Sequence, residues 1–189
     1  MEDNGVKIFN AGNKTEHRDT TDLDIIVLAE ELKRNMANGN AAKAKELGKL
    51  LAGMTPDSDD LNEELKAILA DRSVTNDIKL QLRILMVFAA EHTLFRLLPP
   101  LVAATASDAL YDKLRRDEYE FYETVSGGTS FTFYYLAVKK DDANKAIGES
   151  FAMLCNADNN AVIRYLGQQT FALMCAQIEK MIEERSFEK

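Results

Sequence analysis

Residues 76–98 read NDIKLQLRILMVFAAEHTLFRLL, and two prolines, Pro99 and Pro100, follow at once. Thr75 or Asn76 can cap this stretch as a helix. The prolines end it, because they lack amide donors and restrict the residue before them. Apolar residues cover most of the helical circumference, which is typical of a helix in the middle of a bundle. We therefore predict a central apolar helix at about 76–98, with the rest of the chain packed around it.

The remaining sequence also repeats its apolar residues with helical spacing. A first helix is expected from Asp22 to the Asn38-Gly39-Asn40 stretch, where glycine and asparagine tolerate a left-handed backbone. Residues 100–125 fit one helix, or two helices with a break near Ser107-Asp108. Further helices are predicted over 41–53, 58–70, 141–155 and 160–185. The expected fold is all-α, an irregular bundle of seven or eight helices.

Residues 130–138 fit two structures. Phe131, Phe133 and Tyr135 alternate as in a strand, whereas Phe131, Tyr135 and Val138 have helical spacing. A single strand would have no partner in this chain, so we expect a helix.

The last predicted helix, 160–185, carries apolar residues on two flanks, more than one packing groove requires. These flanks hold Val162, Leu166 and Leu173 on one side, and Phe171, Met174, Ile178 and Met181 on the other. Such width indicates either deep burial or a subunit interface. It motivates the prediction that the protein is a homo-oligomer.

Composition limits the partners and the location. The chain has 189 residues and a formal net charge of −8 without a basic block, which argues against nucleic acid and membrane surfaces as partners. Residues 1–20 read as a polar, flexible arm without a signal-peptide pattern, and residues 21–189 as one helical domain. Cys155 and Cys175 lie in apolar contexts, which favours reduced thiols and a cytoplasmic location.

Catalytic and metal-binding motifs are not apparent. The two histidines and two cysteines have no zinc or di-iron spacing, so we predict no metal and no cofactor. A Gly-x-Ser-x-Gly motif is absent as well. These observations favour a non-enzymatic protein. An enzyme that uses Glu118 or Glu91 with His92 is the third hypothesis.

Glu91 and Glu118 fall on apolar helix faces, and an unpaired charge in the interior is costly. One interpretation is functional, a raised pKa and a role in catalysis or ligand anchoring. The other is structural, a carboxylate satisfied by a tyrosine hydroxyl or by an arginine such as Arg83, Arg115 or Arg164.

Seven of the fifteen aromatic residues lie between Tyr119 and Tyr135, on both sides of a Gly-Gly pair. This block predicts a possible tyrosine-lined pocket, although aromatic residues at helical spacing usually form core. The candidate ligand-binding residues are Glu91, His92, Glu118, Tyr119, Tyr122, Gly127, Gly128, Thr129, Tyr134 and Tyr135. The sequence thus favours an interaction or regulatory module that binds protein, itself or another. The alternative is a small-molecule-binding protein with its pocket near residues 118–135.

Overall fold

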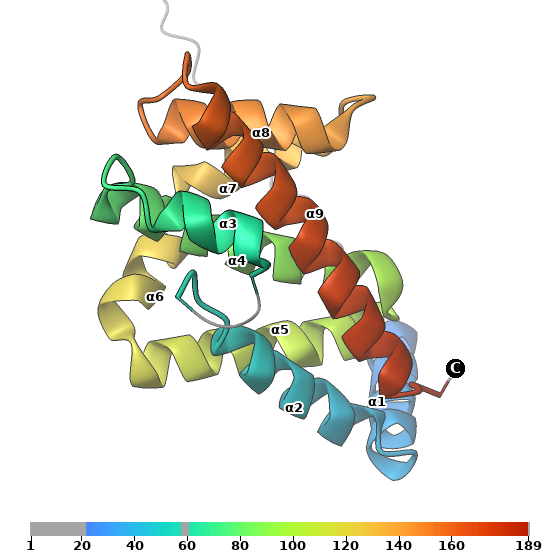
Figure 1. The fold of residues 1–189 in the computed structure, drawn as a ribbon. Coiled ribbons are helices and arrows are strands. Elements are labelled where there is room, and N and C mark those ends of the chain that lie inside the picture. The colour runs from blue at the N-terminus through green and yellow to red at the C-terminus, as the bar shows by residue number, and fades with distance from the viewer. Residues whose placement is uncertain (1–21, 58–60, 189) are drawn as a thin grey trace, which may run out of the picture.

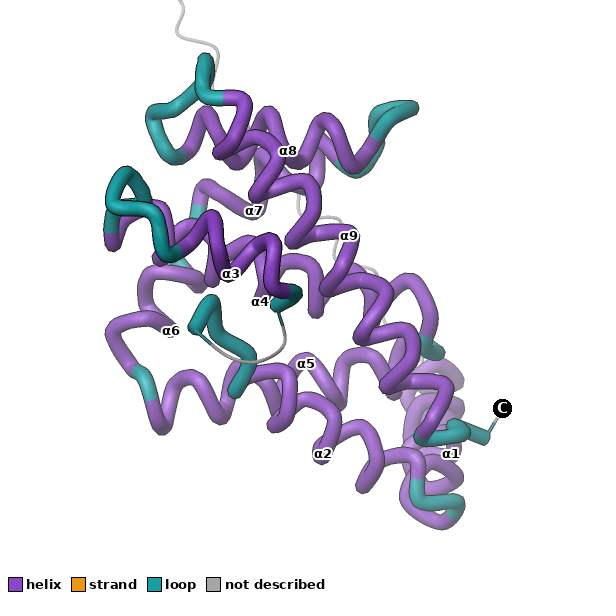
Figure 2. The backbone as a smooth tube through the Cα atoms, viewed as in Figure 1, coloured by secondary structure: helices purple, strands orange, loops and turns teal. Residues whose placement is uncertain are grey.

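The computed structural model describes residues 22–57 and 61–188 (Figure 1). Within these ranges the chain forms helices and no strand, so the all-α prediction is confirmed (Figure 2). The described helices number nine, one more than the upper prediction. The predicted polar arm over residues 1–20 lies outside the described residues. The helices are α1 (Asp22–Ala37), α2 (Asn40–Ala52), α3 (Glu63–Leu69), α4 (Asn76–Leu97), α5 (Pro100–Asp117), α6 (Tyr119–Ser126), α7 (Thr129–Ala137), α8 (Ala143–Leu154) and α9 (Ala161–Glu184).

Helix α4 is the centre of the bundle, as the sequence predicts. It packs against α2, α5, α7, α8 and α9, and every residue from Ile84 to Ala90 is buried. The Thr75 hydroxyl accepts a hydrogen bond from the Ile78 amide at the start of the helix. Leu98 is extended at its end, because the following proline disfavours the helical conformation. The path of α4 across the bundle therefore follows from its own sequence.

The break within residues 100–125 lies ten residues later than the two-helix alternative places it. Ser107 and Asp108 are inside α5, and the chain turns at Glu118, whose φ is −147° and ψ is 60°. Ser107 is buried between apolar neighbours on the inner face of α5. Packing of this face outweighs the weak helix propensity of serine and aspartate. The prediction of a break near Ser107-Asp108 is therefore wrong.

Residues 129–137 form helix α7, which confirms the helical interpretation of this stretch. Ser130, Tyr134 and Ala137 are buried and follow one another at helical spacing. Phe133 and Tyr135, two members of the strand-like alternation, are each 40% exposed. The alternation of aromatic residues does not correspond to one buried face.

Two helix pairs approach closely because a glycine lies at each crossing. A Cβ atom at Gly48 of α2 would lie 2.0 Å from the carbonyl oxygen of Ala106 in α5. A Cβ atom at Gly148 of α8 would lie 2.5 Å from the carbonyl oxygen of Arg164 in α9. Both distances are too short for any side chain, so these glycines set how the two pairs pack.

Helix α9 crosses the front of the molecule from α8 to the region of α1 (Figure 1). Its apolar flanks contact both sides of the core: Leu166, Phe171, Met174 and Ile178 are buried, and Leu173 and Met181 pack against the core. Only Val162, at the beginning of the helix, is largely exposed among the flank residues, at 53%. Of the two explanations for the apolar width of α9, deep burial accounts for nearly all of it.

No helix in the described part of the chain has the length and apolar character needed to cross a membrane.

Candidate functional site

Glu91 lies at the centre of a small polar cluster between α4, α5 and α7. The Tyr111 hydroxyl donates to one carboxylate oxygen at 2.5 Å, and the Tyr135 hydroxyl donates to the other at 2.7 Å. Burial, followed by the hydrogen bond to Glu91, raises the pKa of both phenols, so both remain protonated donors. Tyr122 is close enough to Tyr111 to raise the pKa of Tyr111 further. This arrangement agrees with the structural interpretation of Glu91, a carboxylate satisfied by tyrosine hydroxyls.

His92 packs against aromatic rings next to this cluster. Its ring is stacked on Phe88, with ring centroids 5.9 Å apart, and it lies 5.9 Å from the ring of Phe171. Burial, together with the positive charge of Arg96, lowers the pKa of His92. A neutral imidazole in this place is a packing group, and no carboxylate is shown to hydrogen-bond it as a catalytic pair would require.

Glu118 has an arginine partner. Both guanidinium nitrogens of Arg83 donate to the two carboxylate oxygens, which is the bidentate geometry that favours this pair. The same guanidinium lies 4.1 Å from the centre of the Phe121 ring. The hydrogen bonds from Arg83 lower the pKa of Glu118. Glu118 is thus a charged structural residue, and it does not belong to the Glu91 cluster.

The other candidate residues are dispersed. Tyr134 points into the core with 0% exposure, and its hydroxyl has no hydrogen-bond partner among the described residues. Tyr119 is 60% exposed and contacts only Tyr122 among the aromatic rings, at 6.3 Å. Gly127, Gly128 and Thr129 form the connection between α6 and α7. Of the ten candidates, the structure brings only Glu91 and Tyr135 into a direct hydrogen bond between side chains.

One residue of the Glu91 cluster was not among the residues predicted for this site. Tyr111, one turn before Leu114 on α5, completes the Glu91 cluster, although its sequence context gave no sign of that partner.

Within the described residues, no group of three His, Cys, Asp or Glu side chains is arranged to hold a metal ion. Burial raises the pKa of the Cys155 thiol to about 12, so this cysteine is not a reactive thiolate.

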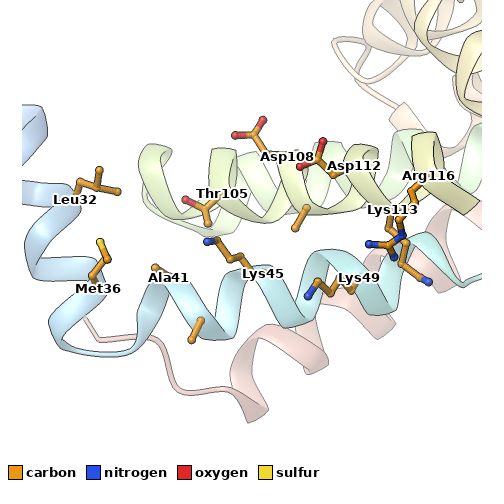
Figure 3. A pocket seen from close by; sticks show the side chains of 12 residues that line it. Leu32, Met36, Ala41, Lys45, Lys49, Thr105, Asp108, Asp112, Lys113 and Arg116 are labelled. Carbon is orange, nitrogen blue, oxygen red and sulfur yellow. The ribbon is translucent and has the colours of Figure 1, made fainter.

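The surface has a groove of about 800 Å³ between α2 and α5, away from the tyrosine cluster. Figure 3 shows Lys45 and Lys49 on the α2 side and Asp108 and Asp112 on the α5 side. Leu32 and Met36 of α1 close one end of the groove. Lys45, Lys49 and Asp108 form no ion pair with any described residue. In this groove, charged side chains without a described ion-pair partner therefore lie beside exposed apolar side chains of α1.

Helix α1 contacts the rest of the molecule mainly through two polar side chains. Asn35 is buried and accepts a hydrogen bond from the Asn40 side chain at 3.4 Å, and Glu31 is half-buried. The large apolar side chains of this helix are exposed, and their exposed fractions are Ile25 54%, Ile26 54%, Val27 60%, Leu28 49%, Leu32 45% and Met36 67%. The sequence showed these apolar residues at helical spacing. The same spacing is expected of a helix side that packs against the core, so the sequence analysis did not predict that the apolar side chains of α1 are exposed.

No family model, no curated protein and no solved structure matches this chain.

Proposed function

We propose that this protein is a non-enzymatic interaction module that self-associates through α1. The observation that carries the proposal is the apolar side of α1, which the described residues leave uncovered. At 100° per residue, Ile25, Leu28, Leu32 and Met36 fall within about 80° of one another around the helix. We call these four residues the α1 stripe. Exposed apolar surface of this extent on one element is typical of an interaction site.

A second copy of the chain is the occupant that fits the α1 stripe. The spacings of three, four and four residues match those of helices that pair along an apolar seam. The α1 sequence begins Asp-Leu-Asp at residues 22–24 and has Lys33 and Arg34 near its end. Two copies of α1 in antiparallel orientation would bring the acidic start of each helix over the basic end of the other. Such pairing has two-fold symmetry, the commonest symmetry of homo-oligomers.

The expected strength of this association is moderate. Complete burial of one such side chain contributes about 1.5–3 kcal/mol, and each stripe residue is already about half-buried, which leaves about 1 kcal/mol each. Four side chains from each of two copies give on the order of 8 kcal/mol, against an association cost of at least about 4 kcal/mol. We therefore expect a concentration-dependent equilibrium of monomer and dimer, with the α2–α5 groove adding contact area beside Leu32 and Met36.

Sedimentation velocity over a wide range of protein concentrations tests the proposal. The wild-type protein should change from monomer to dimer as concentration rises. The substitution Leu32→Glu in the middle of the stripe should shift the equilibrium toward monomer, because it places a charge in the apolar interface. The matched control is Ile26→Glu, on the same helix and similarly exposed but outside the stripe. A wild-type protein that stays monomeric at the highest concentration would contradict the proposal. This result is also expected if residues 1–21 of the same chain cover the stripe.

The alternative, a tyrosine-lined small-molecule site near residues 118–135, has less support. The Glu118 carboxylate is engaged by Arg83, and the Glu91 carboxylate is engaged by two phenols. A ligand would have to displace these contacts.

For the location, two cysteines without a disulfide agree with a reducing compartment, and we propose the cytoplasm.

A further inference from the structure

A second groove, of about 670 Å³, lies between α3 and the beginning of α9. Its apolar lining includes Ile68 and Val74 on one side and Val162 on the other. Val162 is 53% exposed, the most exposed apolar flank residue of α9. The residues that line it come from α3 and the beginning of α9, and Figure 1 shows these two segments away from α1. Self-association through α1 would therefore leave it accessible.

Among the described residues that line this groove, the only charged side chains are acidic, Glu64 and Asp71. Glu64 is held in place by the Tyr165 hydroxyl, which donates to it across the groove at 2.9 Å. Asp71 accepts a hydrogen bond from the Ser73 amide at 2.8 Å, and the Ser73 hydrogen bonds lower the pKa of Asp71. Hydrogen bonds therefore hold both carboxylates in position at the groove. Arg72 follows Asp71 in the sequence, and Arg164 precedes Tyr165. Neither arginine lines the groove.

The beginning of α9 does not turn this groove into an anion site. The Asn160 side chain caps the helix and accepts hydrogen bonds from the Val162 and Ile163 amides at 3.0 and 3.2 Å. These amides are therefore already satisfied and are not available to an anionic ligand. The charges that remain for a ligand are the carboxylates of Glu64 and Asp71.

We propose that this groove docks a basic amphipathic helix of a partner protein. Apolar side chains of that helix would cover Val162, Ile68 and Val74, as helices do when they bind in grooves. Glu64 is in the first turn of α3, and Asp71 follows two residues after the end of that helix. Lysine or arginine residues on both sides of the apolar stripe of the partner would pair with these two carboxylates.

Binding of synthetic peptides measured by fluorescence anisotropy tests this docking site. The probe is a fluorescein-labelled helical peptide with a leucine stripe flanked by two lysines seven residues apart. Its counterparts are the same peptide with glutamates in place of the two lysines, and a scrambled peptide of the original composition. The lysine peptide should bind saturably and more tightly than both. In the double variant Glu64→Lys/Asp71→Lys we expect its affinity to fall about tenfold or more, and that of the glutamate peptide to rise.

The apolar part of the groove needs its own matched pair of variants. Val162→Gln should weaken the lysine peptide several-fold, whereas Val27→Gln, an identical change at a 60% exposed position on α1, should not. Leu32→Glu should also bind the peptide as the wild type does, so failure of self-association and failure of docking are distinguishable. Circular dichroism spectra of all variants establish that they are folded. The proposal is wrong if the lysine peptide does not bind saturably, if the scrambled peptide binds equally well, or if neither groove variant changes the affinity.

Discussion

Individual residues explain why two apparently unusual glutamates need no catalytic role. Glu91 accepts from two phenols and Glu118 accepts from one guanidinium, so each buried or half-buried charge has its partners. The sequence could indicate that such partners were required, and it suggested Arg83 as a candidate. It could not indicate which glutamate each partner would reach, because Arg83 and Glu118 are 35 positions apart in the chain.

Tyr134 of α7 and Tyr111 of α5 offer a matched test of these hydrogen bonds. The Tyr134 hydroxyl is buried without a described partner, so Tyr134→Phe should leave the free energy of unfolding unchanged or raise it by up to about 1 kcal/mol. Tyr111→Phe removes a donor from the Glu91 carboxylate and should lower the free energy of unfolding by about 1–2 kcal/mol. Urea denaturation measures both. Equal destabilisation by the two substitutions would contradict this assignment.

His92 makes the stability of the fold depend on pH. Burial and Arg96 lower its pKa below the value of 6.5 of an unperturbed histidine. As pH falls below that value, the unfolded state takes up a proton more readily than the folded state, so stability decreases; above it, this effect is absent. Thermal unfolding between about pH 7.5 and pH 5.5 should show the decrease. The variant His92→Gln should show less of it.

At the scale of elements, the sequence predicted most helices but did not identify the helix whose apolar side chains are exposed. The apolar flanks of α9 were interpreted as a possible interface, and the structure buries them against neighbouring helices on two sides. Helix α1 has ordinary helical spacing of apolar residues, yet the least exposed of its described side chains are polar, Glu31 and Asn35. Periodicity gives the apolar side of a helix and does not tell what covers that side.

The crossing of α2 and α5 can be tested at a single glycine. Gly48→Ala should lower the free energy of unfolding by about 1–3 kcal/mol, because the new methyl group would overlap the Ala106 carbonyl. This loss outweighs the gain of about 1 kcal/mol that alanine brings to a helix. Gly53→Ala is the control, since Gly53 has a right-handed backbone with φ of −82° at the end of the same helix. If Gly48→Ala is as stable as the wild type, the close approach of α2 and α5 is not as described.

For the whole molecule, the proposed self-association would couple stability to protein concentration. A ligand that binds only the folded state raises the unfolding temperature by mass action, and a second copy acts as such a ligand. The thermal midpoint of the wild-type protein should therefore rise with protein concentration, as measured by differential scanning calorimetry. The midpoint of Leu32→Glu should be independent of concentration. A wild-type midpoint that does not change with concentration would argue against folding coupled to association.

The sequence by itself determined the all-helical class, the central position of α4 and the ends of that helix. These features depend on local signals: apolar spacing, a capping threonine and two prolines. Tertiary structure decided the partners of Glu91 and Glu118, the close crossing at Gly48 and the exposure of Ile25, Leu28, Leu32 and Met36. Those outcomes depend on which segments meet in space, and contacts between residues distant in the chain leave no local pattern in one sequence.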